Sequence, residues 1–246
     1  MSLEEAAPVS SSAPTPGHPA DPSTRPLVVA IDGTSGSGKS STSRGVAIRL
    51  GLRYLDTGAM FRAMTWWMLR HGVDVHDADA VAARVDEPQL VSGTDPQAPT
   101  ITADGSDVAG PIRTDEVNAA VSPVSAVPAV RSRLLRLQRE VIAADPTGIV
   151  VEGRDIGSVV APDAPVKVYL SADPAARASR RAAEQGGADV AATRESLLAR
   201  DRIDSGRSTA PLVMADGAVH IDTTPYSLDE VIGLIAGLVE SAEAHP

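Results

Sequence analysis

The stretch Leu27–Ser40, LVVAIDGTSGSGKS, decides the fold. Its apolar first half predicts a buried strand over 27–31. Its second half has the phosphate-loop pattern of a glycine, four further residues and then Gly-Lys-Ser. The glycines let successive backbone N–H groups turn toward phosphate oxygens. A helix predicted over 39–50 would point its positive N-terminal end at the same anion. The stretch therefore predicts a nucleoside triphosphate site, and a Gly/Ser-rich surface turn is the alternative.

Two side chains give this loop its chemistry. Lys39 can reach the β- and γ-phosphates of ATP, and the Ser40 hydroxyl can ligate the accompanying Mg²⁺. The chain has only two lysines, Lys39 and Lys167, and otherwise uses arginine as its strong base. A flexible ammonium therefore stands where a point charge suits phosphate. The residues of the loop expected to bind ATP are Gly33, Thr34, Ser35, Gly36, Ser37, Gly38, Lys39, Ser40 and Ser41.

Composition excludes several classes of protein. The 246 residues allow one α/β domain with appendages, and the absence of cysteine excludes disulfides, zinc–thiolate sites and cysteine nucleophiles. The net charge of −10 and the scarcity of aromatic residues argue against nucleic-acid binding. The sequence shows neither a basic start followed by an apolar segment nor an apolar run of membrane-spanning length. We therefore expect a cytoplasmic monomer that binds small molecules, and neither nucleic acid nor a membrane.

The order of segments along the chain indicates a doubly wound parallel sheet. Continuous apolar runs predict strands over 148–152, 166–170 and 218–221. Helical patterns cover 114–125 and 129–143, and a capping box at Ser227–Glu230 opens a closing helix. Short β-like fragments between 77 and 113 indicate a small insert. The Pro-, Ser- and Ala-rich residues 1–26 predict a disordered tail before a domain that spans 27–246.

Several acidic and basic positions have two interpretations at this stage. Asp32, Asp56 and Glu152 end predicted strands, where ligands of such sheets bind. Asp32 or Glu152 is a candidate for orienting metal-bound water, while Asp56 either caps the next helix or meets a ligand. We expect a solvated helix face for Arg133, Arg136 and Arg139, and structural roles for His71, His76 and His220.

A second group of motifs narrows the function. A guanine-specific GTPase would need Asn-Lys-x-Asp, but the single asparagine, Asn118, is followed by alanine. The segments DTGAMFR (56–62), IRT (112–114), EGRDIG (152–157) and RDRIDSGR (200–207) resemble, in order and spacing, the bacterial cytidylate kinases. Thr57, Phe61 and Glu152 stand where that family commonly has serine, tyrosine and aspartate. These changes keep a hydroxyl, a ring and a carboxylate, so we expect adjusted geometry and retained activity.

The resemblance implies a fold and a reaction. The fold would be the parallel sheet of P-loop kinases, with a core over about 27–61, 144–176 and 208–246. An acceptor-binding region with the β insert would cover about 62–143, and a lid about 177–207. The enzyme would transfer the γ-phosphate of ATP to CMP or dCMP. The alternatives are another small acceptor, such as UMP or a non-nucleotide metabolite, and a regulatory protein without transferase activity.

The resemblance also implies roles for individual residues. Thr57, Arg62 and Arg154 would hold the acceptor phosphate, while Ser122, Arg131 and Asp155 would read the cytosine ring. Arg200 and Asp204 would contact the sugar, and Arg207 would reach the acceptor phosphate and the transferring group. The set expected in catalysis is Lys39, Arg62, Arg154, Arg200 and Arg207. Phe61 and Arg113 complete the expected CMP site, Arg177 and Arg181 the expected ATP site, and Ser40 is the expected metal ligand.

Overall fold

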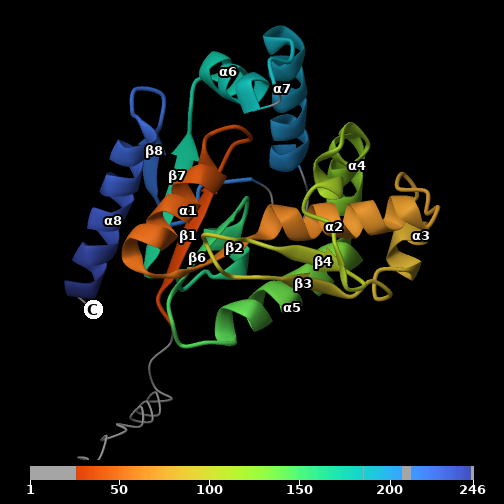
Figure 1. Cartoon of the computed structure of the whole chain (residues 1–246), viewed down its shortest axis with the longest axis horizontal. Helices are drawn as coiled ribbons and strands as arrows, with labels where there is room; N and C mark the ends of the chain where they lie inside the picture. Colours follow the sequence, from red (N-terminus) through yellow and green to blue (C-terminus); the bar gives the residue numbers. More distant parts are fainter. Residues whose placement is uncertain (1–25, 185, 207–211, 245–246) are drawn as a thin grey trace, which may run out of the picture.

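The computed structural model describes residues 26–184, 186–206 and 212–244, so the predicted tail, apart from Pro26, lies outside it. Five parallel strands form the central sheet (Figure 1). No helix in the described ranges has the length and apolarity needed to cross a membrane. Across the sheet the order is β2 (Arg53–Asp56), β6 (Ile149–Gly153), β1 (Val28–Gly33), β7 (Val166–Ser171) and β8 (Val219–Asp222).

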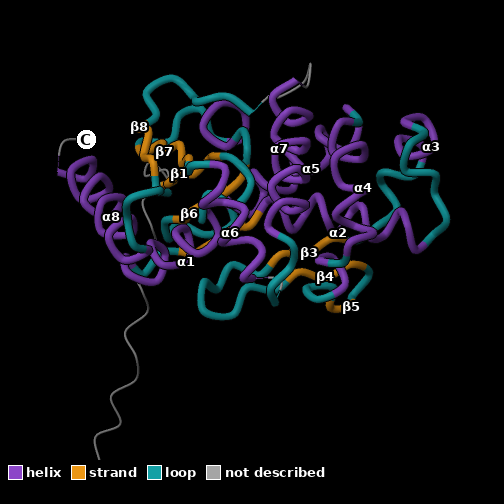
Figure 2. The backbone as a smooth tube through the Cα atoms, turned by 90° about the horizontal axis from the view of Figure 1, so that it is seen from above, coloured by secondary structure: helices purple, strands orange, loops and turns teal. Residues whose placement is uncertain are grey.

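Helices cover both faces of the sheet, as an apolar run such as β1 requires. Val29 and Ile31 pack with α1 (Lys39–Leu50) and α8 (Leu228–Ala244), while Val28 and Ala30 face the opposite core. That second core contains residues of α2 (Thr57–Arg70) and α5 (Pro128–Ala143). Figure 2 shows α8 and α3 (Ala78–Ala83) at opposite ends of the molecule. The predicted fold class is confirmed, although β1 continues two residues past the predicted end at Ile31.

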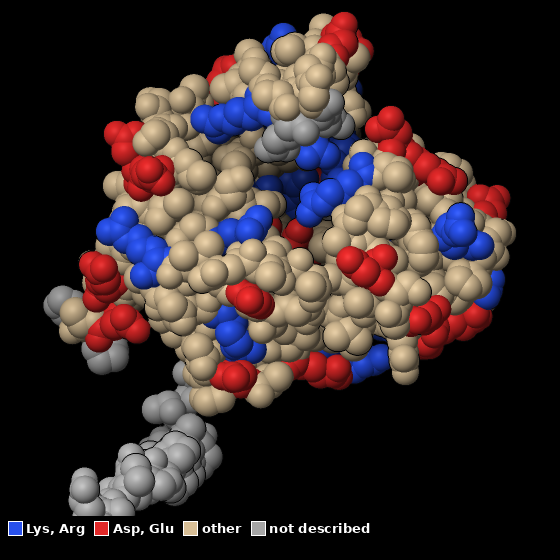
Figure 3. Space-filling model, in the orientation of Figure 1, with Lys and Arg blue, Asp and Glu red and all other residues tan. Residues whose placement is uncertain are grey.

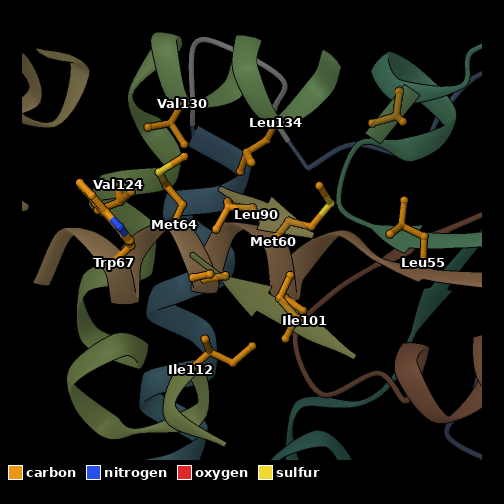
Figure 4. Packing of buried hydrophobic residues seen from close by; sticks show 14 of the residues in the cluster. Leu55, Met60, Met64, Trp67, Leu90, Ile101, Ile112, Val124, Val130 and Leu134 are labelled. Carbon is orange, nitrogen blue, oxygen red and sulfur yellow. The ribbon is translucent and has the colours of Figure 1, made fainter. Parts of the chain in front are cut away.

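The predicted insert is a small antiparallel sheet of β3 (Leu90–Ser92), β4 (Ile101–Ala103) and β5 (Ser106–Asp107). Its Leu90 and Ile101 belong to the same apolar cluster as Met60 and Met64 of α2 (Figure 4). The N–H of Tyr54 on β2 also donates to the Thr94 carbonyl, at 2.9 Å. The insert is therefore fixed both to α2 and to the edge of the main sheet.

Four further elements lie around the carboxyl ends of the strands: the 3₁₀ turn η1 (Pro111–Arg113), α4 (Asp115–Ala126), α6 (Pro174–Glu184) and α7 (Val190–Gly206). The family resemblance implied a lid over about 177–207 without giving its secondary structure, and α7 forms within it. Leu197 and Asp204 are its buried residues, so little apolar periodicity marked this helix in the sequence. After β6 the chain forms a π-helical turn, η2 (Ile156–Val160), which the sequence did not predict.

Local capping signals are confirmed at two helix starts. The Asp56 carboxylate accepts a hydrogen bond from the Ala59 N–H at 2.9 Å and so caps α2. At the start of α8, the Glu230 carboxylate accepts from the Ser227 N–H at 2.8 Å, and the Ser227 hydroxyl accepts from the Glu230 N–H at 3.4 Å. This is the predicted reciprocal capping box.

We predict that Gly33→Ala destabilises the protein by about 3 kcal/mol. The added methyl group would collide with the backbone of the neighbouring strand, which cannot move aside as a side chain could. A Cβ at Gly33 would lie 2.0 Å from the carbonyl oxygen of Leu170, its partner on β7. Gly51→Ala is the matched control, since Gly51 has φ +65° but nothing within 4 Å of its added Cβ. That variant should cost only about 1 kcal/mol of backbone strain. Equal falls in Tm for the two variants would refute the steric argument.

Candidate active site

A cleft of about 480 Å³ lies at the carboxyl ends of the strands. Figure 3 shows Lys and Arg side chains gathered around this hollow, with an acidic group inside it. The predicted residues that line it come from the phosphate loop and the start of α1, α2, η1, α4, α5, the β6–η2 turn, α6 and α7. They are Ser35, Gly36, Gly38, Lys39, Ser40, Ser41, Thr57, Phe61, Arg62, Arg113, Ser122, Arg131, Arg154, Asp155, Arg181, Arg200 and Asp204. Gly33, Thr34, Ser37 and Arg177 lie outside this lining, and Arg207 lies outside the described residues.

The phosphate loop is braced by its own side chains. Lys39 Nζ donates to the Thr34 carbonyl oxygen at 2.7 Å, and Ser37 Oγ donates to the same oxygen at 2.9 Å. Burial lowers the pKa of Lys39 to about 7, and the nearby Arg154 adds to this fall. Negative charge placed in the loop would stabilise the ammonium, so the site is electrostatically prepared for an anion.

The Glu152 carboxylate lies opposite the Ser40 hydroxyl, which donates to Glu152 Oε2 at 3.1 Å. The buried Tyr54 hydroxyl donates to the other oxygen, Oε1. Burial raises the pKa of Glu152 to about 7, with a further rise from Asp56. Tyr54 was not among the predicted site residues. The sequence signal that could have indicated Tyr54 is its position two residues before Asp56, on the strand that pairs with β6.

Asp32, the other candidate for orienting metal-bound water, binds backbone N–H groups in the structure. Its two carboxylate oxygens accept from the N–H groups of Ile156 and Gly157, both at 2.8 Å. Burial raises the pKa of Asp32 to about 6 in spite of these two bonds. Asp32 therefore holds the start of η2, directly after Asp155, and so fixes where the Asp155 side chain enters the cleft.

Asp155 and Arg131 form a buried ion pair on one wall, with Nη2 to Oδ2 at 2.5 Å. Arg131 Nη1 also donates to the Ser125 carbonyl at 3.2 Å, and the guanidinium lies 5.3 Å from the centre of the Phe61 ring. The pair presents a carboxylate and a guanidinium side by side next to an aromatic face. Such an arrangement can recognise a ring that offers both a donor and an acceptor.

Four arginines concentrate positive charge between this wall and the phosphate loop. Arg62 lies near Arg200 and Arg181, and burial together with these neighbours lowers its pKa to about 9. Burial, and then Arg154, also lowers the pKa of Arg200. Arg154 Nη1 donates to the Gly33 carbonyl at 2.6 Å, which places the guanidinium beside the phosphate loop. The cluster is suited to several phosphate groups at once.

Asp204 is buried and forms an ion pair with Arg154, with Nε to Oδ2 at 3.1 Å. The spacing of four residues between Arg200 and Asp204 also allowed a mere ion pair on the helix surface, and the burial of Asp204 excludes that interpretation. The Thr57 hydroxyl is also turned inward, since it donates to the Glu152 carbonyl at 2.7 Å. Asp204 thus contacts an arginine of the cleft, and Thr57 contacts the backbone of β6.

Arg177, expected to bind ATP, is buried beside the phosphate loop. Its Nη1 donates to the Ser35 carbonyl at 3.0 Å and pairs with Asp201. The Asp201 carboxylate also accepts from the Ser35 N–H, at 3.1 Å. These contacts connect α6, α7 and the loop. Asp201 belongs to the RDRIDSGR segment but was given no role, because a salt bridge across two helices leaves no mark in sequence spacing.

Of the remaining arginine and histidine residues, some are exposed to solvent and others make structural contacts. Arg136 is exposed as predicted, whereas the prediction of a solvated Arg133 is wrong: its guanidinium donates to the carbonyls of Val85 and Pro88 and is largely buried. Arg139 is exposed, yet its guanidinium donates to the carbonyls of Val159 and Val160. His71 stacks on Trp67, and His220 bonds to Ser171, which agrees with their predicted structural roles.

Comparisons with known proteins point to one family. A family model described as cytidylate kinase matches residues 29–241. The cytidylate kinase of Streptomyces coelicolor is 59% identical over 225 residues, which cover 92% of this chain and 97% of that protein. The cytidylate kinase of Streptomyces avermitilis is 57% identical over 218 residues, 89% of this chain and 94% of that protein. The cytidylate kinase of Mycobacterium leprae is 48% identical over 218 residues, 87% and 96% of the two chains.

Proposed function

The chain belongs to the cytidylate kinase family and is a kinase that phosphorylates CMP and dCMP; we propose that the cleft is where it does so. The observation that carries the proposal is that one cleft contains two subsites with a cluster of arginines between them. The phosphate loop with Lys39 lies on one side, and the buried Asp155–Arg131 pair lies on the other. The first subsite suits ATP and the second suits a cytosine ring.

Charge neutralisation is the main catalytic task in this proposal. The acceptor phosphate of CMP is already ionised at neutral pH, so the reaction needs no strong general base. Catalysis consists of holding the two phosphates in line and stabilising negative charge on the moving phosphoryl group. Lys39, Arg62 and Arg154 surround that position, and Arg200 adds a further guanidinium from α7. Arg207 keeps the role that the family resemblance implies for it, and it lies outside the described residues.

The acceptor side of the cleft divides between phosphate, sugar and base. Arg62, Arg113 and Thr57 line the region proposed for the phosphate, and Arg200 and Asp204 line the region proposed for the sugar. The base would contact the wall of the cleft that contains the Asp155–Arg131 ion pair. The residues of this wall are Phe61, Ser122, Arg131 and Asp155. On the donor side we assign ATP to the loop residues 33–41 and to Arg181, with Arg177 supporting the loop from behind.

The residues present fit a Mg²⁺ ion bound together with ATP. Ser40 supplies an exposed hydroxyl, and the Glu152 carboxylate lies within hydrogen-bond distance of it. Among the described residues there is no cluster of three or more His, Asp or Glu side chains that could hold a metal without nucleotide. A bound Mg²⁺ would neutralise charge on the β- and γ-phosphate oxygens. Ser40 would ligate it, and Glu152 would orient its water ligands.

A panel of acceptors tests the proposed function. Initial rates would be measured with ATP and Mg²⁺ against CMP, dCMP, UMP and shikimate. The proposed cleft predicts high kcat/KM for CMP and dCMP and little turnover of the others. Faster phosphorylation of UMP or of a non-nucleotide acceptor would overturn the assignment of the base site.

We propose that residues of about 177–207 act as a lid over ATP, and that ATP plus CMP protects this segment. Arg181 and Arg200 repel Arg62 while the cleft holds no phosphate, and bound phosphates would remove this repulsion. We therefore predict that amide exchange in α7 slows by about tenfold when both nucleotides are present. The measurement is hydrogen exchange followed by mass spectrometry, with α8 as the internal control. Equal exchange in α7 with and without nucleotides would refute the lid.

A further inference from the structure

Arg62 is held in place by neutral acceptors. Its Nη1 donates to Asn118 Oδ1 at 2.7 Å and to the Ile112 carbonyl oxygen at 3.2 Å. A guanidinium only donates hydrogen bonds, so the Asn118 amide must turn its oxygen toward Arg62. Its Nδ2 group then faces the Arg113 carbonyl and donates to it at 3.4 Å. Asn118 thus links two of the arginines that line the acceptor side of the cleft.

The surroundings of Arg62 leave its positive charge without a paired carboxylate. Among the described residues, no ion pair includes Arg62, while Arg154, Arg131 and Arg177 each have an acidic partner. Arg200, Arg181 and Arg113 act on Arg62 as like charges, and Asp56 is the opposite charge that acts on it. An amide oxygen fixes the orientation of a guanidinium without neutralising it, which a carboxylate in the same place would do.

We infer that Asn118 is a positioning residue for the acceptor phosphate: it orients Arg62 through a neutral contact and so keeps the charge of Arg62 available to the nucleotide. The inference rests on the proposed function, in which Arg62 binds that phosphate. Nη1 of Arg62 donates both of its hydrogens, one to Asn118 and one to Ile112. The Nε and Nη2 edge, with three N–H groups, therefore remains for a phosphate, and this edge is one that binds two oxygens at once.

Two substitutions separate orientation from charge. Asn118→Asp keeps the shape of the side chain but places a carboxylate against Nη1 of Arg62, and this carboxylate neutralises the charge that the acceptor phosphate needs. Asn118→Ala removes the contact and leaves Arg62 charged but held by the Ile112 carbonyl alone. We expect the KM for CMP to rise about tenfold in Asn118→Asp and about threefold in Asn118→Ala, since loss of an immobilised rotamer costs less than neutralisation. The KM for ATP should stay within about twofold of wild type in both.

Cytidine is the probe that distinguishes this role from a structural one, because it lacks the phosphate. Its inhibition constant should be unchanged in both variants. The control Asp115→Asn makes the reverse carboxylate-to-amide exchange on the exposed first turn of α4 and should leave the KM for CMP unchanged. A merely structural Asn118 would give the opposite order, with Asn118→Asp close to wild type, and would weaken CMP and cytidine together. Either of those results would overturn the inference. If wild type failed to phosphorylate CMP, the proposed function would fail instead.

Discussion

Lys39→Met should lower kcat by about 10³-fold or more while the protein remains folded. Methionine keeps the unbranched length of lysine but removes the ammonium that we propose to lie near the transferring phosphate. The loss therefore acts on the transition state and leaves the apolar core unchanged. Lys39 is also a half-buried cation whose pKa is lowered by desolvation and by the neighbouring Arg154. Removing that cation takes away a repulsion, so the Tm should not fall.

Lys167→Met is the matched control, because Lys167 is the other lysine of the chain. It lies on β7, and its Nζ donates to the Asp216 carbonyl at 3.3 Å. Lys167 is half-buried and lies outside the lining of the cleft, so the same chemical change there should leave kcat within about twofold of wild type. The measurements are steady-state rates with ATP and CMP and thermal unfolding of all three proteins. Near-normal turnover of a folded Lys39→Met protein would exclude the loop as the ATP site.

The elements of the fold that could be predicted are those in which local pattern and burial agree. The residues Val28–Ile31 of β1 are buried on both faces of the sheet, and their continuous apolar run made the strand recognisable. The capping signals at Asp56 and Ser227 are equally local, since each depends on residues three positions apart. The insert was predicted from short β-like fragments between turn residues, and these became β3, β4 and β5.

The features that could not be predicted depend on contacts between distant segments. Helix α7 has few buried residues, so its 17-residue length left almost no apolar period in the sequence. Arg133 lay on what looked like a solvated face, but the carbonyls of Val85 and Pro88, 48 and 45 residues away, accept its hydrogens. The same holds for Tyr54 and Glu152, which meet only because β2 and β6 are neighbours.

The candidate site shows the same division. The phosphate loop was predictable because the whole motif lies within eight residues, and its side chains contact one another. The acceptor residues were placed by family resemblance, and the structure gathers those that it describes around one cleft. Their partners were not predictable. Neither the Asp204–Arg154 pair nor the Arg177–Asp201 pair follows from spacing along the chain.

The buried Asp155–Arg131 pair should make wild type prefer CMP over UMP by several powers of ten in kcat/KM. An ionised carboxylate only accepts hydrogen bonds, and cytosine offers an amino donor at N4 where uracil has a carbonyl oxygen. Since Asp155 and Arg131 are both buried, water cannot easily relieve a mismatch between carboxylate and carbonyl. Asp32 fixes the backbone turn after Asp155, and the ion pair with Arg131 restrains the Asp155 carboxylate itself.

Asp155→Ala should therefore lower kcat/KM for CMP far more than for UMP and narrow the ratio between them. Because this change also leaves Arg131 buried without its carboxylate, it can cost about 3–5 kcal/mol of stability. Asp155→Asn avoids most of that cost, since an amide oxygen can still accept from Arg131 while its NH₂ group can donate to the uracil oxygen. We expect Asp155→Asn to lose activity on CMP and to gain activity on UMP relative to wild type. The experiment compares kcat/KM for CMP, dCMP and UMP in the three proteins, with thermal unfolding to verify that each is folded. If wild type used UMP as well as CMP, or if the ratio stayed the same in a folded Asp155→Asn protein, a group other than Asp155 must read the base.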